Sequence, residues 1–163
     1  TGLRFFTVYG PWGRPDMALH IFTKAMVEDT AFEVFNNGDM SRDFTYVGDI
    51  VESIKRLIPL APKENNPAFN PKKPTPSKSS KAYQIFNIGN NSPVALMDFV
   101  KAVEKALDKK GKIIFKPMQP GDVQSTYANV ESLFNYINFK PETKLEDGVK
   151  AFVAKYLELN NKS

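Results

Sequence analysis

Short apolar segments typical of strands alternate along this chain with segments of helical periodicity, and this alternation limits the possible folds more than any other feature. The predicted strands are residues 3–9, 32–35, 44–47, 83–88 and 112–116. The predicted helices are residues 17–28, 49–60, 96–107, a short segment after Asn129, and 145–157. We expect Asp16 and Asn129 to cap the helices that follow them, and Ser92 and Pro93 to introduce the third helix. Strands and helices in alternation predict an α/β fold.

Half of the chain's 12 prolines lie in residues 59–81, together with five lysines and one glutamate. This tract therefore carries an excess of four positive charges, which equals the net charge of +4 for the whole chain. Such a segment buries too little apolar surface to offset the entropy lost on ordering, so we predict a mobile, solvated loop. We expect residues 1–163 to form one structural unit, which this loop interrupts without dividing it into two domains.

The composition argues against several classes of protein. The chain has no cysteine, which excludes disulfides and thiolate zinc sites and fits a reducing compartment such as the cytoplasm. The sequence shows no signal-peptide pattern and no apolar run near the roughly 18 residues of a membrane span, so we expect no membrane partner. Nucleic acid is not an expected partner either, because the basic excess lies in a loop with a single aromatic residue, Phe69, that could stack on bases. The scattered acidic residues predict no metal site.

Familiar catalytic motifs are missing or misplaced. Neither a G-x-G-x-x-G turn nor a P-loop occurs. His20 lies inside a predicted helix, where a single histidine is more typical of structure than of catalysis. Tyr136 and Lys140 have the Y-x-x-x-K spacing of short-chain dehydrogenases, but that arrangement needs a continuous helix. Pro141 disfavours helical geometry at Lys140, so we interpret this spacing as a coincidence.

Two arginines lie at positions that suit anion binding. Arg14 follows the strand of residues 3–9, in a loop shaped by glycine and proline that leads into a helix. Open α/β sheets bind ligands at the carboxyl ends of their strands, and a guanidinium there suits a carboxylate or a phosphate. Arg42 lies just before the predicted strand of residues 44–47, at its start. Spacing alone, however, favours the alternative that Arg14 and Arg42 form ordinary surface ion pairs.

Two further segments could recognise other parts of a ligand. Phe35 ends a predicted strand and could stack on a base, although a core position is the simpler interpretation. Residues 119–122 (Gln-Pro-Gly-Asp) form a predicted tight turn that presents the Asp122 carboxylate, which could accept hydrogen bonds from sugar hydroxyls.

These segments, in this order, closely resemble the UDP-glucuronate 4-epimerases, a group of extended short-chain dehydrogenases/reductases. The resemblance rests on four stretches that leave out little more than the proline-rich tract: TVYGPWGRPDMA (7–18), RDFTYVGDIV (42–51), YQIFNIGNNSPV (83–94) and MQPGDVQSTYANV (118–130). The GPWGRPDM run is specific, since related decarboxylases and dehydratases share YGP and RD-F but differ around residues 12–17. The resemblance implies the carboxyl-terminal part of a Rossmann-like fold, with the last one or two sheet strands and a small mixed α/β lobe that binds the UDP-sugar.

The resemblance also implies roles for single residues. Thr7 and Arg14 match the pair that clamps the sugar carboxylate and would hold the 4-keto intermediate so that it keeps its CO2. Phe35 matches the position beside uracil, Arg42 an arginine at the diphosphate, and Asp122 a carboxylate near the ribose.

Three further positions follow from the same resemblance. Gln119 stands where UDP-galactose epimerases carry an arginine, so the resemblance leaves no clear phosphate role for this substrate-site position. Phe6 and Val8 match positions close to the nicotinamide. The catalytic Ser/Thr, Tyr and Lys and the glycine-rich turn that binds NAD are expected upstream of Thr1. The resemblance thus implies that the NAD-binding domain is absent from this chain, which by itself would bind no NAD and have no epimerase activity.

The intact enzyme implied by the resemblance converts UDP-glucuronate to UDP-galacturonate through a 4-keto intermediate and transient NADH, as a cytoplasmic homodimer that supplies polysaccharide synthesis. Two alternatives stay open. The parent could act on another UDP-sugar, as a decarboxylase, a dehydratase or an epimerase of neutral sugars, in which case Arg14 would have no sugar carboxylate to bind. The chain could also be a binding module without a catalytic half.

Overall fold

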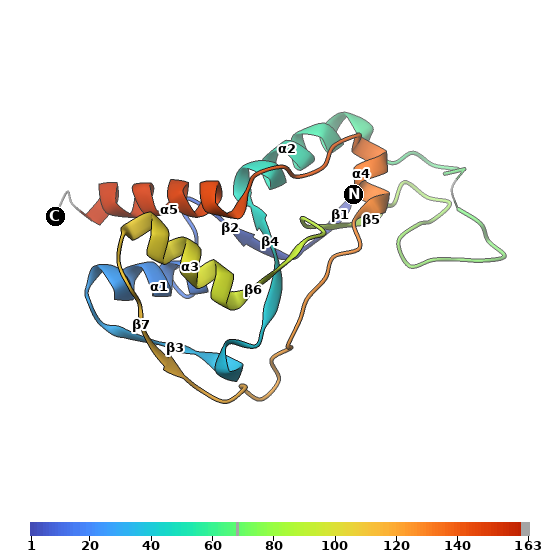
Figure 1. Ribbon diagram of the computed structural model, residues 1–163. Coiled ribbons are helices and arrows are strands. Elements are labelled where there is room, and N and C mark those ends of the chain that lie inside the picture. Colours follow the sequence, from blue (N-terminus) through green and yellow to red (C-terminus); the bar gives the residue numbers. More distant parts are fainter. Residues whose placement is uncertain (68, 161–163) are drawn as a thin grey trace.

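The computed structural model describes residues 1–67 and 69–160, and it has the mixed α/β architecture that the sequence predicts. Among the described residues, three small β-sheets lie with two groups of helices (Figure 1). One group contains α1 (Ala18–Val27), α3 (Leu96–Leu107) and α5 (Leu145–Asn160). The other contains α2 (Val47–Leu57) and α4 (Glu131–Ile137).

The strands pair mostly in parallel. β1 (Gly2–Phe5) pairs with β5 (Ile85–Ile88), and β3 (Ala31–Val34) pairs with β7 (Lys112–Phe115). β2 (Thr7–Tyr9) runs parallel to β4 (Ser41–Tyr46), with Thr7 opposite Phe44, and the short β6 (Pro93–Ala95) runs antiparallel to β4. β4 is therefore the centre of the largest sheet and connects both helical groups.

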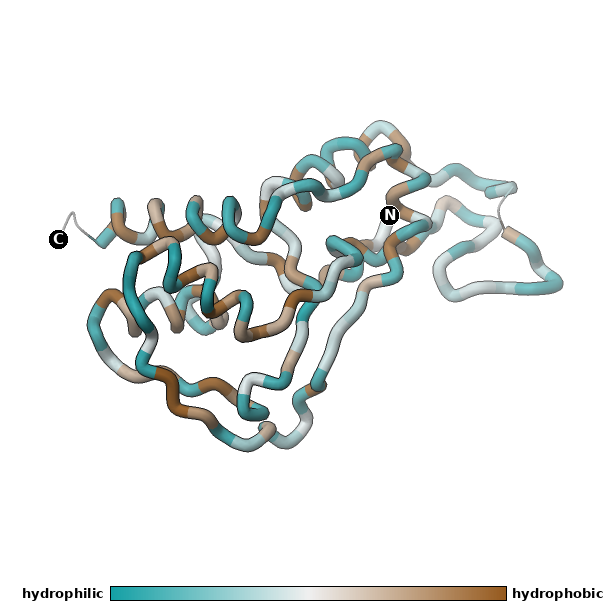
Figure 2. Tube along the Cα trace, in the orientation of Figure 1, coloured by the Kyte–Doolittle hydropathy of each residue, from teal (hydrophilic) through white to brown (hydrophobic). Residues whose placement is uncertain are grey.

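The larger core lies between α1, α3 and α5 and the strands that they cover. Its aromatic side chains pack in edge-on and stacked pairs, of which Phe44 and Phe99 are stacked with centroids 4.2 Å apart. The apolar stripe of α3 supplies Phe99, Val100 and Val103, each at most 1% exposed. In Figure 2 the hydrophobic positions of these helices face one another, as the helical periodicity predicts.

A smaller core fixes the second helical group on β1 and β5. It contains the buried side chains of Ile50, Leu57, Phe86, Ile88, Leu133 and Ile137. Arg56 strengthens the contact between α2 and the segment after α4, since its Nη1 donates to the Asn138 carbonyl at 3.1 Å and its guanidinium lies 4.7 Å from the centre of the Phe139 ring.

The structure corrects several local predictions. The strand predicted at residues 3–9 is two strands, because β1 and β2 pair with different partners and Phe6 lies between them, donating its N–H to Ile88. Asp16 does not cap α1 and Asn129 does not cap α4; their N-cap residues are Met17 and Val130, without side-chain caps. Residues 93–95 form a strand before α3, so this helix begins later than its Ser-Pro signal suggests.

The proline-rich tract 59–81 forms no α-helix or β-strand among its described residues, beyond the short 3-10 helix Ile58–Leu60 and one bridge from Lys78 to Gln84. It extends from the body of the molecule beside β1 and β5 (Figure 1). The prediction of a loop is thus confirmed, whereas its mobility stays a prediction.

Candidate functional site

All eight residues that the sequence singles out for binding line one cavity of about 800 Å3. They reach it from β2 and the residue before it, from the loop that leads into α1, from the end of β3, from β4 and from the turn at residues 119–122. The eight are Phe6, Thr7, Val8, Arg14, Phe35, Arg42, Gln119 and Asp122. Segments more than a hundred residues apart in the sequence therefore form one concave surface.

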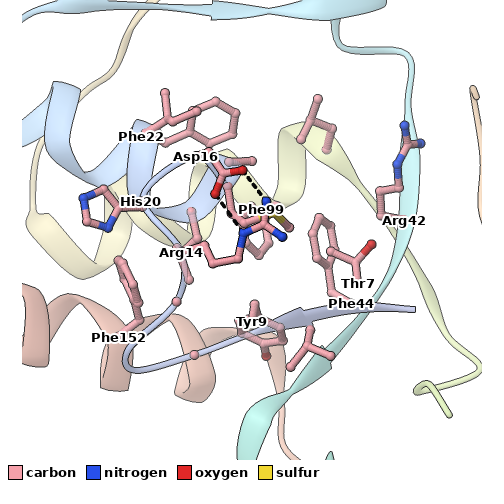
Figure 3. Close-up of a pocket in the computed structure, with 18 of the residues that line it drawn as sticks. Thr7, Tyr9, Arg14, Asp16, His20, Phe22, Arg42, Phe44, Phe99 and Phe152 are labelled. Atoms are coloured by element: carbon pink, nitrogen blue, oxygen red, sulfur yellow. Dashed lines mark hydrogen bonds and ion pairs between the residues drawn. The ribbon is translucent and has the colours of Figure 1, made fainter. Parts of the chain in front are cut away.

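The loop between β2 and α1 places Arg14 at the mouth of this cavity. Gly10 and Trp12 both have left-handed φ values, 137° and 66°, which turn the chain sharply after β2. The Arg14 guanidinium binds the Asp16 carboxylate at two points, with Nε donating to Oδ1 at 3.0 Å and Nη2 donating to Oδ2 (Figure 3). This hydrogen bonding lowers the pKa of Asp16. The pair remains open to solvent, because the two side chains are 74% and 61% exposed.

Arg42 lies in a more buried setting on β4. Its side chain is 17% exposed, and its Nη2 donates to Asp122 Oδ1 at 2.8 Å. Its Nη1 donates to the carbonyl oxygens of Ser41 at 2.9 Å and Gln124 at 3.1 Å. Three acceptors thus hold the guanidinium in one orientation on the cavity wall.

Asp122 reaches Arg42 because the chain after it runs beside β4. The Ser41 N–H donates to Gln124, the Thr126 N–H donates back to Ser41, and the two hydroxyls of Ser41 and Ser125 lie 2.7 Å apart. In Figure 1 this segment extends past β4 from β7 towards α4. The predicted turn is also present, since the Asp122 N–H donates to the Gln119 carbonyl and Gly121 has a φ of 82°.

The role of Asp43, which is fully buried beside Arg42, was not predicted from the sequence. Its Oδ1 accepts the Asn90 N–H at 2.9 Å, and its Oδ2 accepts the N–H groups of Asn91 and Ala128, both at 3.0 Å. One carboxylate thereby joins β4, the loop after β5 and the segment that carries Asp122. Only the polar character of the Arg-Asp pair directly before the predicted strand 44–47 could have drawn attention to it.

The remaining predicted positions form the apolar part of the wall. Phe35 is half-buried at the start of the 3-10 helix Phe35–Gly38, so it is neither fully core nor fully exposed. Val8 also packs against the smaller core, and Phe6 packs against the buried cluster of Ala128, Val130 and Phe134.

His20 and the Tyr136–Lys140 spacing, which we interpreted as structural or coincidental, have surroundings that agree with those interpretations. His20 lines the far side of the cavity and packs edge-on against the rings of Phe152 and Tyr156. Tyr136 lies in α4 but Lys140 lies beyond its end, so the Y-x-x-x-K spacing does not share one helix. Within residues 1–67 and 69–160 no group of three or more histidine, aspartate or glutamate side chains could hold a metal ion.

Three cavity residues were missed as candidates. Asp16 was predicted to be a helix cap, and only the Arg-Pro-Asp spacing hints at its pairing with Arg14. Trp12 is 75% exposed, with the Lys155 ammonium 5.0 Å from its ring centre. Tyr9 lies at the base of the cavity, where burial raises the pKa of its hydroxyl strongly and nearby carboxylates, Asp49 foremost, add to the shift.

Comparison with known proteins shows which proteins the chain is similar to. Residues 1–70 match the NAD dependent epimerase/dehydratase family. The protein CapI of Staphylococcus aureus is 57% identical over 162 residues, which are 99% of this chain and 48% of CapI. A probable UDP-glucuronate 4-epimerase of Rhizobium meliloti is 46% identical over 157 residues, which are 96% of this chain and 46% of that protein. The chain is homologous to this family of epimerases and dehydratases.

Solved structures give the same result for the fold. The UDP-glucuronic acid 4-epimerase of Bacillus cereus, in complex with UDP-glucuronic acid and NAD, superposes with a TM-score of 0.77 at 28% identity. The match covers 96% of this chain and 45% of that one. The predicted Rossmann-like, extended short-chain dehydrogenase/reductase fold is thereby confirmed. The chain spans about half the length of the curated relatives it matches. No described helix combines the length and the apolar character that crossing a bilayer requires.

Proposed function

We propose that this chain is the UDP-sugar-binding, carboxyl-terminal portion of a UDP-glucuronate 4-epimerase. The observation that carries the proposal is the convergence of all eight predicted residues on one cavity of about 800 Å3. That volume lies in the range of cavities that bind ligands of this size. Both kinds of polar group that a nucleotide sugar needs are present: arginines for its anionic parts and a carboxylate for its hydroxyls.

The two arginines would bind different parts of the ligand. The half-buried Arg42 is held by three acceptors and would bind the diphosphate, which every UDP-sugar shares. The exposed Arg14, with the Thr7 hydroxyl, would bind the sugar carboxylate, which only an acidic sugar carries. Asp122 would then accept hydrogen bonds from the ribose, and Phe35 would pack on the uracil ring. Gln119 also lines the cavity, but its neutral amide cannot form an ion pair with a phosphate.

NAD would be bound by the rest of the longer protein. The chain contains no glycine-rich phosphate-binding turn, whereas the half-buried Phe6 and Val8 provide the kind of apolar surface that fits the face of a nicotinamide ring. The chemistry supplied by such a cofactor in the intact enzyme would be reversible hydride transfer with the sugar. Because the proposed catalytic residues lie in the other half, we expect this chain alone to have no epimerase activity. We further propose that the intact enzyme is a cytoplasmic homodimer.

One observation favours a second candidate, an enzyme that acts on a neutral UDP-sugar. Asp16 already neutralises Arg14, so a sugar without a carboxylate could enter the cavity without leaving an unpaired cation. The two candidates differ in whether Arg14 contributes to binding.

Calorimetric titration of the 163-residue chain with UDP, UDP-glucose and UDP-glucuronate tests both candidates. We expect all three to bind, and Arg14→Met to weaken UDP-glucuronate about tenfold because one charge-assisted contact is lost. UDP and UDP-glucose should be unaffected by that variant. Arg4→Met, which removes an exposed arginine on β1 outside the cavity, is the matched control. Equal weakening of UDP-glucose and UDP-glucuronate by Arg14→Met would refute the carboxylate clamp, and failure of all three to bind would refute a UDP-sugar site on this chain.

A further inference from the structure

We infer that Asp16 is an internal competitor for Arg14, which the carboxylate of an acidic sugar must displace, and that Asp16 therefore sets the preference of the site between acidic and neutral UDP-sugars. This inference rests on the proposed function and adds a specificity-determining residue to it.

The contact between the two side chains already has the geometry of guanidinium–carboxylate recognition. Nε and Nη2 of Arg14 donate to the two different oxygens of Asp16, the two-point arrangement that a sugar carboxylate would also adopt (Figure 3). Both residues line the cavity. A ligand carboxylate arriving at Arg14 therefore meets donors that another carboxylate already uses.

Local geometry favours this pairing over helix capping. Pro15 separates the two residues and disfavours helical geometry at Arg14. The chain turns here, because the Met17 N–H donates to the Arg14 carbonyl at 3.2 Å. Helix α1 begins only after Met17 and has no side-chain cap, so the Asp16 carboxylate is directed at Arg14 instead of at the helix.

The exposure of the pair makes the exchange feasible. With 74% and 61% of the two side chains exposed, Asp16 can turn into water without the cost of burying an unpaired charge. The Arg42–Asp122 pair on the opposite wall differs, because its side chains are 17% and 34% exposed and the guanidinium has two further acceptors. Of these two pairs, the Arg14–Asp16 pair is the one that is free to change partners.

The competition affects acidic ligands alone. A neutral sugar can bind while Arg14 stays paired with Asp16, so it gains and loses nothing there. An acidic sugar must break that pair and approach a second negative charge. Removing the Asp16 charge should thus tighten the binding of UDP-glucuronate and leave UDP-glucose and UDP unchanged.

Calorimetry on the 163-residue chain with UDP, UDP-glucose and UDP-glucuronate tests the inference in a double-mutant cycle. We expect Asp16→Asn to tighten UDP-glucuronate about two- to fivefold relative to UDP-glucose, the range expected for one exposed ion pair. Asp16→Glu, which keeps the charge, should retain the selectivity of the original chain. In the Arg14→Met background the selective effect of Asp16→Asn should be much smaller, because the competition for Arg14 is gone and only the repulsion between Asp16 and the sugar carboxylate remains. Asp98→Asn, at an exposed aspartate outside the cavity that pairs with Lys101, is the control.

The outcomes separate the inference from the function beneath it. If Asp16 only stabilises the loop, Asp16→Asn will change the affinities of all three nucleotides alike, and the inference is wrong. Weaker binding of UDP-glucuronate alone to Asp16→Asn would also overturn it, since Asp16 would then assist the ligand. Unchanged selectivity with all three nucleotides bound overturns the inference but leaves the proposed UDP-sugar site standing. If none of them binds, the proposed function fails and the inference fails with it.

Discussion

The buried carboxylate of Asp43 offers the sharpest test of how this fold assembles its cavity. Three backbone N–H groups from two separate segments donate to it, at 2.9 to 3.0 Å, and its side chain is inaccessible to solvent. Its own backbone N–H donates to the Thr126 hydroxyl at 3.2 Å. Two substitutions, Asp43→Ala and Asp43→Asn, remove the hydrogen bonds to the carboxylate to different extents.

The expected magnitudes follow from counting the donors left without an acceptor. Alanine leaves three N–H groups unpaired, and each unpaired buried donor costs about 1–3 kcal/mol. Removing the carboxylate also relieves its own desolvation, which offsets part of that cost, so we expect a net loss of about 3–5 kcal/mol. Asparagine can place its amide oxygen at the Oδ2 position and keep the Asn91 and Ala128 N–H groups paired. Its NH2 group then faces the Asn90 N–H, so one donor is lost and the cost is about 1–3 kcal/mol.

Urea denaturation followed by far-ultraviolet circular dichroism measures both free energies of unfolding. The control is Asp98→Asn, which removes a surface carboxylate from an i,i+3 pair and should change stability by less than about 0.5 kcal/mol. A loss below about 1 kcal/mol for Asp43→Ala, or equal losses for the two Asp43 variants, would refute the view that three buried N–H groups depend on this one carboxylate.

Two other measurements probe the cavity wall. Arg42→Met should weaken UDP, UDP-glucose and UDP-glucuronate by a similar factor of about ten in calorimetry, because the proposed contact is to the shared diphosphate; an unchanged affinity for UDP would contradict that role. Burial raises the pKa of Tyr9, so above about pH 10 the unfolded chain releases this proton while the folded chain keeps it, and the free energy of unfolding should fall as the pH rises. Urea midpoints between about pH 8 and 11 measure this slope, which Tyr9→Phe should reduce; an identical slope in the variant would show that other groups cause it.

Segments with strong periodicity were predicted well. The helix predicted at residues 145–157 is α5, and the apolar stripe beginning at Leu96 is buried as the 3.6-residue spacing requires. Residues 3–9 were predicted to be one strand, because a continuous apolar run shows that a segment is extended but not which strands it pairs with. The division at Phe6 depends on β5 and β4, which lie far along the chain.

The predictions of helix caps were wrong for a related reason. A carboxylate before a helix has several possible partners, and sequence rules assign it to the nearest backbone N–H groups. Asp16 instead binds Arg14, whose side chain the proline turn directs towards it. The alignment of residues 122–128 with β4 could not be predicted from the sequence, since it depends on backbone hydrogen bonds and on one buried carboxylate more than eighty residues away.

For the candidate site, spacing alone favoured two surface ion pairs, and the structure shows that this interpretation is only partly right, whereas anion binding by the two arginines stays a prediction. Arg14 and Arg42 are each paired with an aspartate, yet only the first pair is exposed like an ordinary surface pair. The second pair joins residues 80 positions apart, and two carbonyl oxygens support it, so it fixes the shape of the wall. A pair that is held on several sides can orient a diphosphate but cannot easily change partners, whereas an exposed pair can. We therefore expect affinity for the nucleotide to depend on Arg42, and discrimination between sugars to depend on the exchange at Arg14.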